Sequence, residues 1–226
     1  MFLSHVNALQ ASLFSSLAIL SLLLTFVMLG SHWLKNYVYA FAAQSWLIAI
    51  LSASVGYFGR YRELYAIAVL TALFRGLVLP LLLLRIVGRL NVKREIHAVL
   101  QPASSLVIGA CAVMFAFVIA NHMNTQPPPA AHVVVLALTI MLSMKFLGFL
   151  MLAVRDEAIS QILGLLVLEN GIFLGSQILV PGMPLLIEIV ILFDLLIVVA
   201  CFGMLVRFLV VHAGTTSSRA LNRLVG

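Results

Sequence analysis

Residues 161–180 read QILGLLVLENGIFLGSQILV, an almost continuous run of apolar and small side chains interrupted by Glu169 and Asn170. The run has the length of a helix that crosses the hydrocarbon core of a bilayer, about 20 residues. Lipid offers no partner for open backbone groups, so a spanning segment is expected to be helical. The stretch therefore predicts a transmembrane helix with a carboxylic acid near its middle.

Comparable apolar runs lie on both sides of this stretch, separated by short connections rich in turn-forming or charged residues. Together they predict an all-α, polytopic membrane protein of seven helices. The predicted spans are 11–30, 37–57, 65–87, 104–121, 132–154, 161–180 and 185–211.

The composition supports the same class of protein. Of 226 residues, 64% are hydrophobic and 9% are charged, which lies outside the range of soluble domains. The start, MFLSHVNALQ, has no Lys or Arg, so we expect the first span to be retained rather than removed as a signal peptide. Cys111 and Cys201 lie inside apolar runs, where they are expected to be small core residues without a disulfide.

The net charge of +6 comes from basic residues in short connections between apolar runs, which favours a role in membrane orientation over nucleic-acid binding. If successive connections lie on alternate sides of the membrane, Arg60 and Arg62 fall on one side and most other cations fall on the other. The positive-inside rule makes that second face cytoplasmic, with the N-terminus outside and the C-terminus inside. Its cations are Lys35, Arg85, Arg89, Lys93, Arg94, Arg155, Arg207, Arg219 and Arg223.

A proline tract, Pro127 to Pro129, is the clearest interruption of the chain. We expect a four-helix membrane module at 1–126, a linker at 127–131 and a three-helix module with a short basic tail at 132–226.

Five ionisable residues fall inside the predicted spans, where each costs about 2.5 to 3.5 kcal/mol at a helix centre. None is expected to face lipid without a partner, and such residues are candidates for ion or proton pathways. They are Arg75, Lys145, Glu169, Glu188 and Asp194.

Glu169 is separated from a stripe of glycines on its own helix. At 100° per residue Gly164, Gly171 and Gly175 share one face, from which Glu169 projects about 140° away. The glycines suit close packing against one neighbouring helix. Glu169 is therefore expected to meet another span, a hydrated cavity or another subunit.

The other four residues suggest different chemical roles. Glu188 and Asp194 are six residues apart and point about 120° from each other, so they are expected to act at different depths. Lys145 is able to change protonation when buried, whereas arginine keeps its proton, which suits Arg75 to holding a carboxylate charged. The alternative is that all five form buried pairs that only fix helix packing.

No spacing of the six histidines matches a zinc or haem site, and the phosphate-binding pattern GxxxxGK[ST] is absent. We therefore expect no metal, no cofactor and no catalytic residue in this chain.

The stretches RDEAISQILGLLVLENGIFL and PGMPLLIEIVILFDLLIVV, with LTALFRGLVLPLLLLRI in the third span, resemble hydrogenase-4 component E. This family supplies a membrane subunit to group 4 [NiFe]-hydrogenase and formate hydrogenlyase-type complexes. Its members often carry a lysine where this chain has Arg75, so a lysine-based switch at that position is not implied here.

The last three spans also resemble subunit K of NADH-quinone oxidoreductase and the C-type component of Mrp antiporters. In subunit K a proton-path glutamate lies four residues before an asparagine. If Asn170 matches that asparagine, the family position falls on Leu166, and Glu169 is the acid one turn later. The family's second glutamate corresponds to either Glu188 or Asp194.

The resemblance implies a non-catalytic subunit of the bacterial inner membrane that contributes to proton translocation and assembly. The implied partners are antiporter-like and subunit-H-like membrane proteins, the bilayer and, indirectly, a hydrogenase or other redox arm. Two alternatives remain open, a stand-alone secondary transporter and a purely structural scaffold. The absence of an internal repeat argues against the transporter.

Overall fold

The computed structural model of the chain describes residues 7–89, 101–124, 130–156, 158–180 and 203. This part of the chain is all-helical, and six of its helical segments are long and apolar enough to cross a membrane. The protein is a multi-pass membrane protein.

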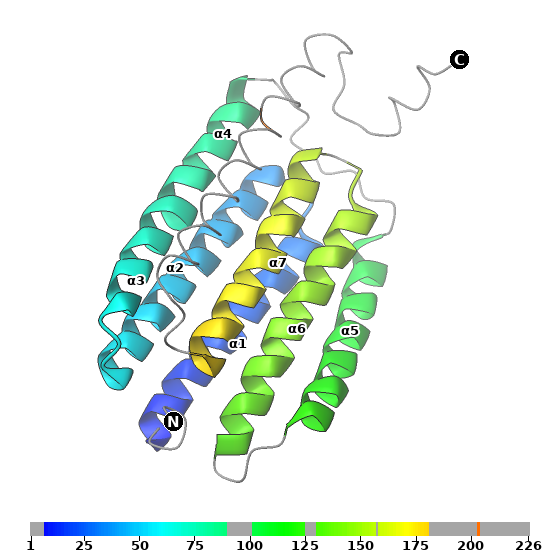
Figure 1. Cartoon of the computed structure of the whole chain (residues 1–226). Helices are drawn as coiled ribbons and strands as arrows, with labels where there is room; N and C mark the ends of the chain where they lie inside the picture. Colours follow the sequence, from blue (N-terminus) through cyan, green and yellow to red (C-terminus); the bar gives the residue numbers. More distant parts are fainter. Residues whose placement is uncertain (1–6, 90–100, 125–129, 157, 181–202, 204–226) are drawn as a thin grey trace.

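The helices run alternately up and down the bundle (Figure 1). Their bounds agree with the first six predicted spans to within a few residues, and the seventh, 185–211, lies outside the described residues except for residue 203. The elements are α1 (Ala8–Gly30), α2 (Leu34–Gly59), α3 (Glu63–Leu73), η2 (Phe74–Val78), α4 (Leu79–Arg89), α5 (Pro102–Met123), α6 (Ala130–Val154) and α7 (Ala158–Leu179).

The third span is continuous but not uniformly α-helical, because one turn of π-helix, η2, joins α3 to α4. Pro80 follows this turn. Proline has no N–H to donate and its ring crowds the carbonyl four residues earlier, here that of Gly76. The widened turn before Pro80 relieves that conflict and carries Arg75.

Helices α6 and α7 form one layer in front of α1 and α2, with α3 and α4 at one edge and α5 at the other (Figure 1). The contact between α6 and α7 depends on glycine. A Cβ added to Gly164, Gly171 or Gly175 would lie within 3.0 Å of an atom of α6. The predicted glycine stripe on α7 is confirmed as a helix-packing surface, and Gly148 of α6 extends it, because a Cβ added there would lie 2.8 Å from the Gly164 carbonyl oxygen.

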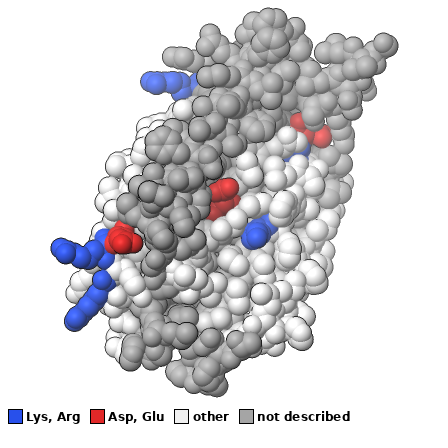
Figure 2. Space-filling model, viewed as in Figure 1, with Lys and Arg blue, Asp and Glu red and all other residues white. Residues whose placement is uncertain are grey.

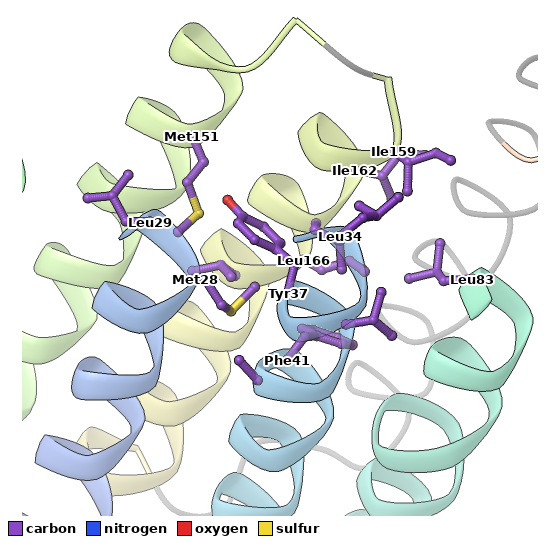
Figure 3. Packing of buried hydrophobic residues seen from close by; sticks show 14 of the residues in the cluster. Met28, Leu29, Leu34, Tyr37, Phe41, Leu83, Met151, Ile159, Ile162 and Leu166 are labelled. Carbon is purple, nitrogen blue, oxygen red and sulfur yellow. The ribbon is translucent and has the colours of Figure 1, made fainter. Parts of the chain in front are cut away.

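Two apolar clusters fill the bundle, one in each half. The first cluster includes Met28, Tyr37 and Phe41 with residues of α4, α6 and α7 (Figure 3). The second includes Ile48, Phe173 and Leu174 with residues of α1, α3 and α6. Helices from both sides of the proline tract contribute to both clusters. The module boundary predicted at 127–131 falls largely outside the described residues, and α6 begins at Ala130.

Arg155, expected in a solvated cytoplasmic connection, is only 4% exposed. Its Nη2 donates to the Leu29 carbonyl oxygen at 2.6 Å, and its guanidinium lies 5.5 Å from the ring centre of Tyr37. Carbonyl groups in the last turn of a helix have no partner within the helix. Arg155 therefore fastens the end of α1 to the connection between α6 and α7.

Candidate mid-membrane polar site

A buried polar layer separates the two apolar clusters. On α2 the first cluster ends at Phe41 and the second begins at Ile48, and Gln44 and Ser45 lie between them. On α7 the switch from one cluster to the other falls between Val167 and Phe173. Helix α1 and the third span likewise contribute to one cluster with one half of their length and to the other cluster with the other half. The layer therefore crosses the bundle at one level, near the middle of each helix. Its members are Ser21, Thr25, Gln44, Ser45, Arg75, Glu169 and Asn170.

Arg75, in η2, is completely buried. Its Nη1 donates to Asn170 Oδ1 at 2.8 Å, and its Nη2 lies 3.7 Å from Glu169 Oε2. The ring centre of Phe173 lies 5.0 Å from its guanidinium carbon, within the range of a cation–π contact. The guanidinium therefore contacts two consecutive residues of α7. Asn170 is a neutral hydrogen-bond acceptor and Glu169 is the counter-charge.

Asn170 connects this arginine to α2. Its Nδ2 donates to Gln44 Oε1 at 3.0 Å and approaches Ser45 Oγ at 3.4 Å, while its Oδ1 accepts from Arg75. Because an asparagine amide has both donors and an acceptor, it joins two helices at once. Asn170 is fully buried, which makes these bonds costly to lose.

Gln44 continues the network to α1. Its Nε2 donates to Thr25 Oγ1 at 2.7 Å and to the Ser21 carbonyl oxygen at 2.9 Å. The Thr25 hydroxyl in turn donates to the same Ser21 carbonyl at 3.1 Å. An unbroken chain of hydrogen bonds thus runs from α1 through α2 and α7 to Arg75 in the third span.

Glu169 is the titratable member of the layer, and its side chain is 29% exposed. It faces away from the glycine stripe, as expected, and the span that it meets is the one carrying Arg75. Glu169 therefore contacts a buried cation and is also partly exposed at the surface of the described bundle.

The other predicted site residues are not all brought together. Lys145 lies on α6 beside Gly171, whose added Cβ would be 3.5 Å from the Lys145 backbone nitrogen. Within the part of the chain that the structure describes, its side chain takes no part in the hydrogen bonds of the polar layer. Figure 2 shows acidic and basic side chains at mid-height on the face formed by α6 and α7. Glu188 and Asp194 lie outside the described residues.

Sequence reasoning identified the charged members of this layer and Asn170, and missed the other neutral members. The only sign of these residues in the sequence is that each polar side chain interrupts an apolar run. They are Gln44, Ser45, Ser21 and Thr25. Such groups are common in transmembrane helices, so their type alone does not distinguish a network from isolated bonds to the preceding turn. Among the described residues, no three His, Cys, Asp or Glu side chains are grouped so that they could hold a metal ion.

The comparisons with known proteins are sparse. No family model matches the chain, and no solved structure matches it. The chain is 34% identical over 146 residues to the uncharacterized protein Rv0085 of Mycobacterium tuberculosis, a match that covers 64% of this chain and 64% of that protein. The match thus spans less than two thirds of the relative's own length.

Proposed function

We propose that this chain is an integral membrane subunit of a membrane-bound [NiFe]-hydrogenase complex of the hydrogenase-4 or formate hydrogenlyase type. Its role is to contribute to proton translocation and to assembly of the membrane arm in the bacterial inner membrane. Redox chemistry belongs to other subunits. The observation that carries this proposal is the pairing of Glu169 with buried Arg75 inside a polar layer at mid-membrane depth.

The chemistry of the layer suits a proton path. Arginine effectively keeps its proton, so Arg75 serves as a fixed positive charge and Glu169 as the group that changes protonation. Glu169 lies at the edge of a hydrogen-bonded chain that reaches α1 through Asn170 and Gln44. Lys145, Glu188 and Asp194 are further relay candidates.

The segments that resemble hydrogenase-4 component E also contain this pair. LTALFRGLVLPLLLLRI carries Arg75, and RDEAISQILGLLVLENGIFL carries Glu169 and Asn170. The resemblance and the buried contact thus point to the same two helices.

Identification of the co-purifying chains tests the assignment to a complex. The tagged protein is solubilised in mild detergent and purified without salt washes, and its partners are identified by mass spectrometry. We expect antiporter-like and subunit-H-like membrane proteins together with a hydrogenase large subunit. A stable homodimer without these chains would favour the stand-alone transporter instead.

A purely structural scaffold remains the second candidate, because buried polar networks also fix helix packing. This candidate is favoured by the hydrogen bonds of Asn170 and Gln44, because the oxygen and the nitrogen of both side-chain amides have partners. The two functions differ in one measurable respect. Neutralising Glu169 leaves a scaffold's proton translocation unchanged, provided that the complex assembles.

A further inference from the structure

Gln44 is a fully buried residue of α2 whose side-chain amide has partners on α1 and on α7. Its Nε2 donates to the Ser21 carbonyl oxygen at 2.9 Å and to Thr25 Oγ1 at 2.7 Å. A backbone carbonyl can only accept, and the Thr25 hydroxyl gives its own hydrogen to that same carbonyl. Both groups of α1 are therefore acceptors toward Gln44, and they require the nitrogen of its amide.

With its nitrogen on α1, the Gln44 amide presents its oxygen to α7. There Asn170 Nδ2 donates to Gln44 Oε1 at 3.0 Å. Ser45 is a second acceptor, because its hydroxyl donates to the Phe41 carbonyl oxygen at 3.0 Å and a lone pair of Oγ faces Asn170 Nδ2 at 3.4 Å. Both contacts with α2 require the nitrogen of the Asn170 amide. Its oxygen is then directed to the third span.

Asn170 Oδ1 is consequently an oriented acceptor for the Arg75 guanidinium. Arg75 Nη1 donates to it at 2.8 Å, whereas Arg75 Nη2 lies 3.7 Å from Glu169 Oε2. The first distance is that of a hydrogen bond, and the second is longer than a hydrogen bond. Because the guanidinium is planar and rigid, a bond at Nη1 also limits where Nη2 can lie. The contact with Asn170 therefore fixes the arginine head group more closely than the contact with Glu169.

Reversal of either amide would be costly, because Ser21, Thr25, Gln44, Arg75 and Asn170 are all fully buried. A reversed Asn170 would place its NH2 group against a guanidinium NH2 group. A reversed Gln44 would place its oxygen against the Ser21 carbonyl oxygen. Buried donors and acceptors that lose their partners pay the full cost of desolvation. The chain of bonds thus has one polarity, which is set at α1 by a backbone carbonyl.

We propose that Gln44 is a positioning residue for the Arg75–Glu169 pair. Gln44 is anchored on the Ser21 carbonyl and orients the Asn170 amide, and Asn170 Oδ1 in turn holds the guanidinium beside Glu169. The charge next to this acid is fixed from α1 and α2, to which neither member of the pair belongs. The inference rests on the proposed function for the role of Glu169 as the acid that exchanges protons, whereas the positioning follows from the hydrogen bonds.

Carbodiimide labelling of Glu169 in membranes tests the positioning. Dicyclohexylcarbodiimide reacts with protonated carboxyl groups, and a neighbouring positive charge favours the ionised form. Gln44→Leu removes the orienting amide and leaves Arg75 and Glu169 unchanged. We expect the labelling rate of Glu169, followed by mass spectrometry of its peptide, to rise by at least about threefold as the guanidinium leaves the acid. An unchanged rate would overturn the proposal.

Ile48→Ala is the matched control. Ile48 lies one turn further along α2, is also fully buried and has an apolar side chain in the second cluster. Its truncation loosens the packing of the bundle without removing a hydrogen bond. We expect the labelling rate of Glu169 to stay close to that of the parent. An equal rise in both variants would overturn the proposal, because the rate would then report loosened packing.

A second background shows whether Gln44 acts through Arg75. Arg75→Met is expected to raise the labelling rate by itself, and Gln44→Leu should raise it no further in that background, because the group to be positioned is absent. An additive rise would contradict the positioning role.

Gln44→Met, with a more adaptable side chain, replaces Gln44→Leu if the latter does not accumulate in the membrane. Failure of both to accumulate while Ile48→Ala does would assign Gln44 to folding alone and overturn the proposal. None of these readouts depends on proton translocation or on other subunits. Failure here is therefore distinct from failure of the proposed function.

Discussion

At the scale of single residues, Asn170 joins the third span to α2 within the polar layer. It accepts from Arg75 and donates to Gln44 and Ser45, although the asparagine side chain itself is small. Glu169 is the functional candidate because of its charge. Asn170 is the residue that determines where Arg75 and Gln44 lie.

Asn170→Leu is therefore expected to destabilise the bundle. The change removes hydrogen bonds to three side chains, and interhelical bonds in membranes are worth roughly 0.6 to 1.7 kcal/mol each. We expect the free energy of unfolding, measured by titration with a denaturing detergent, to fall by about 2 kcal/mol. Ile172→Leu, on an exposed position of the same helix, is the control and should change it by less than about 0.5 kcal/mol. Equal effects of the two substitutions would contradict the role assigned to Asn170.

The charged residues could be recognised from sequence because a charge inside an apolar run is costly and therefore conspicuous. That argument identified Arg75 and Glu169, but it did not establish which carboxylate Arg75 meets. The partner depends on how the third span lies against α7. The position of Gln44 opposite Asn170 is likewise not encoded in any one apolar run.

At the scale of elements, the α6–α7 pair forms the most extensive contact between described helices, and it relies on glycines from both helices. Gly148 approaches the carbonyl of Gly164, so backbone rather than a flexible side chain fills the space next to it. Backbone atoms cannot rotate away from an added methyl group. The two helices would have to separate.

Gly148→Ala is expected to lower the free energy of unfolding by about 1 to 3 kcal/mol, the usual cost of overpacking. Its Cβ would lie 2.8 Å from the Gly164 carbonyl oxygen. Gly30→Ala is the matched control, because its Cβ would meet only the Leu106 side chain at 3.6 Å, an ordinary contact. The same detergent titration compares the two variants. An unchanged midpoint for Gly148→Ala would show that the helices are not packed this closely.

The spans themselves could be predicted well because each apolar run carries its own signal of length and hydrophobicity. The glycine stripe on α7 could be predicted for the same reason, since it lies within one helix. Gly148 could not, because its importance depends on which helix faces α7. The π-turn at η2 had a local signal in Pro80, but proline in a transmembrane helix is also compatible with a simple kink.

At the scale of the whole molecule, the cations lie mainly at one end of the bundle. Lys35 begins α2 and Arg155 fastens the end of α1, whereas Arg60 and Arg62 follow α2 at the opposite end. The positive-inside rule predicts that the end with Lys35 and Arg155 is cytoplasmic.

Cysteine labelling measures this orientation. In a Cys111→Ser, Cys201→Ser background, Arg62→Cys is expected to react with a membrane-impermeant maleimide in intact cells. Lys35→Cys should react only after the membrane is permeabilised. Both side chains replaced are exposed at helix ends, so the two positions differ chiefly in the side of the membrane. The reverse pattern would contradict the predicted topology.

The polar layer gives the molecule its proposed function only if Glu169 exchanges protons during turnover. The most direct measurement is the number of protons translocated per electron by the assembled complex in sealed vesicles, compared between Glu169→Gln and the parent. Glu63→Gln, at the exposed start of α3, is the matched control. We expect Glu169→Gln to reduce this ratio while Glu63→Gln leaves it unchanged. A fully assembled Glu169→Gln complex with the parent's ratio would contradict the proton path through this subunit.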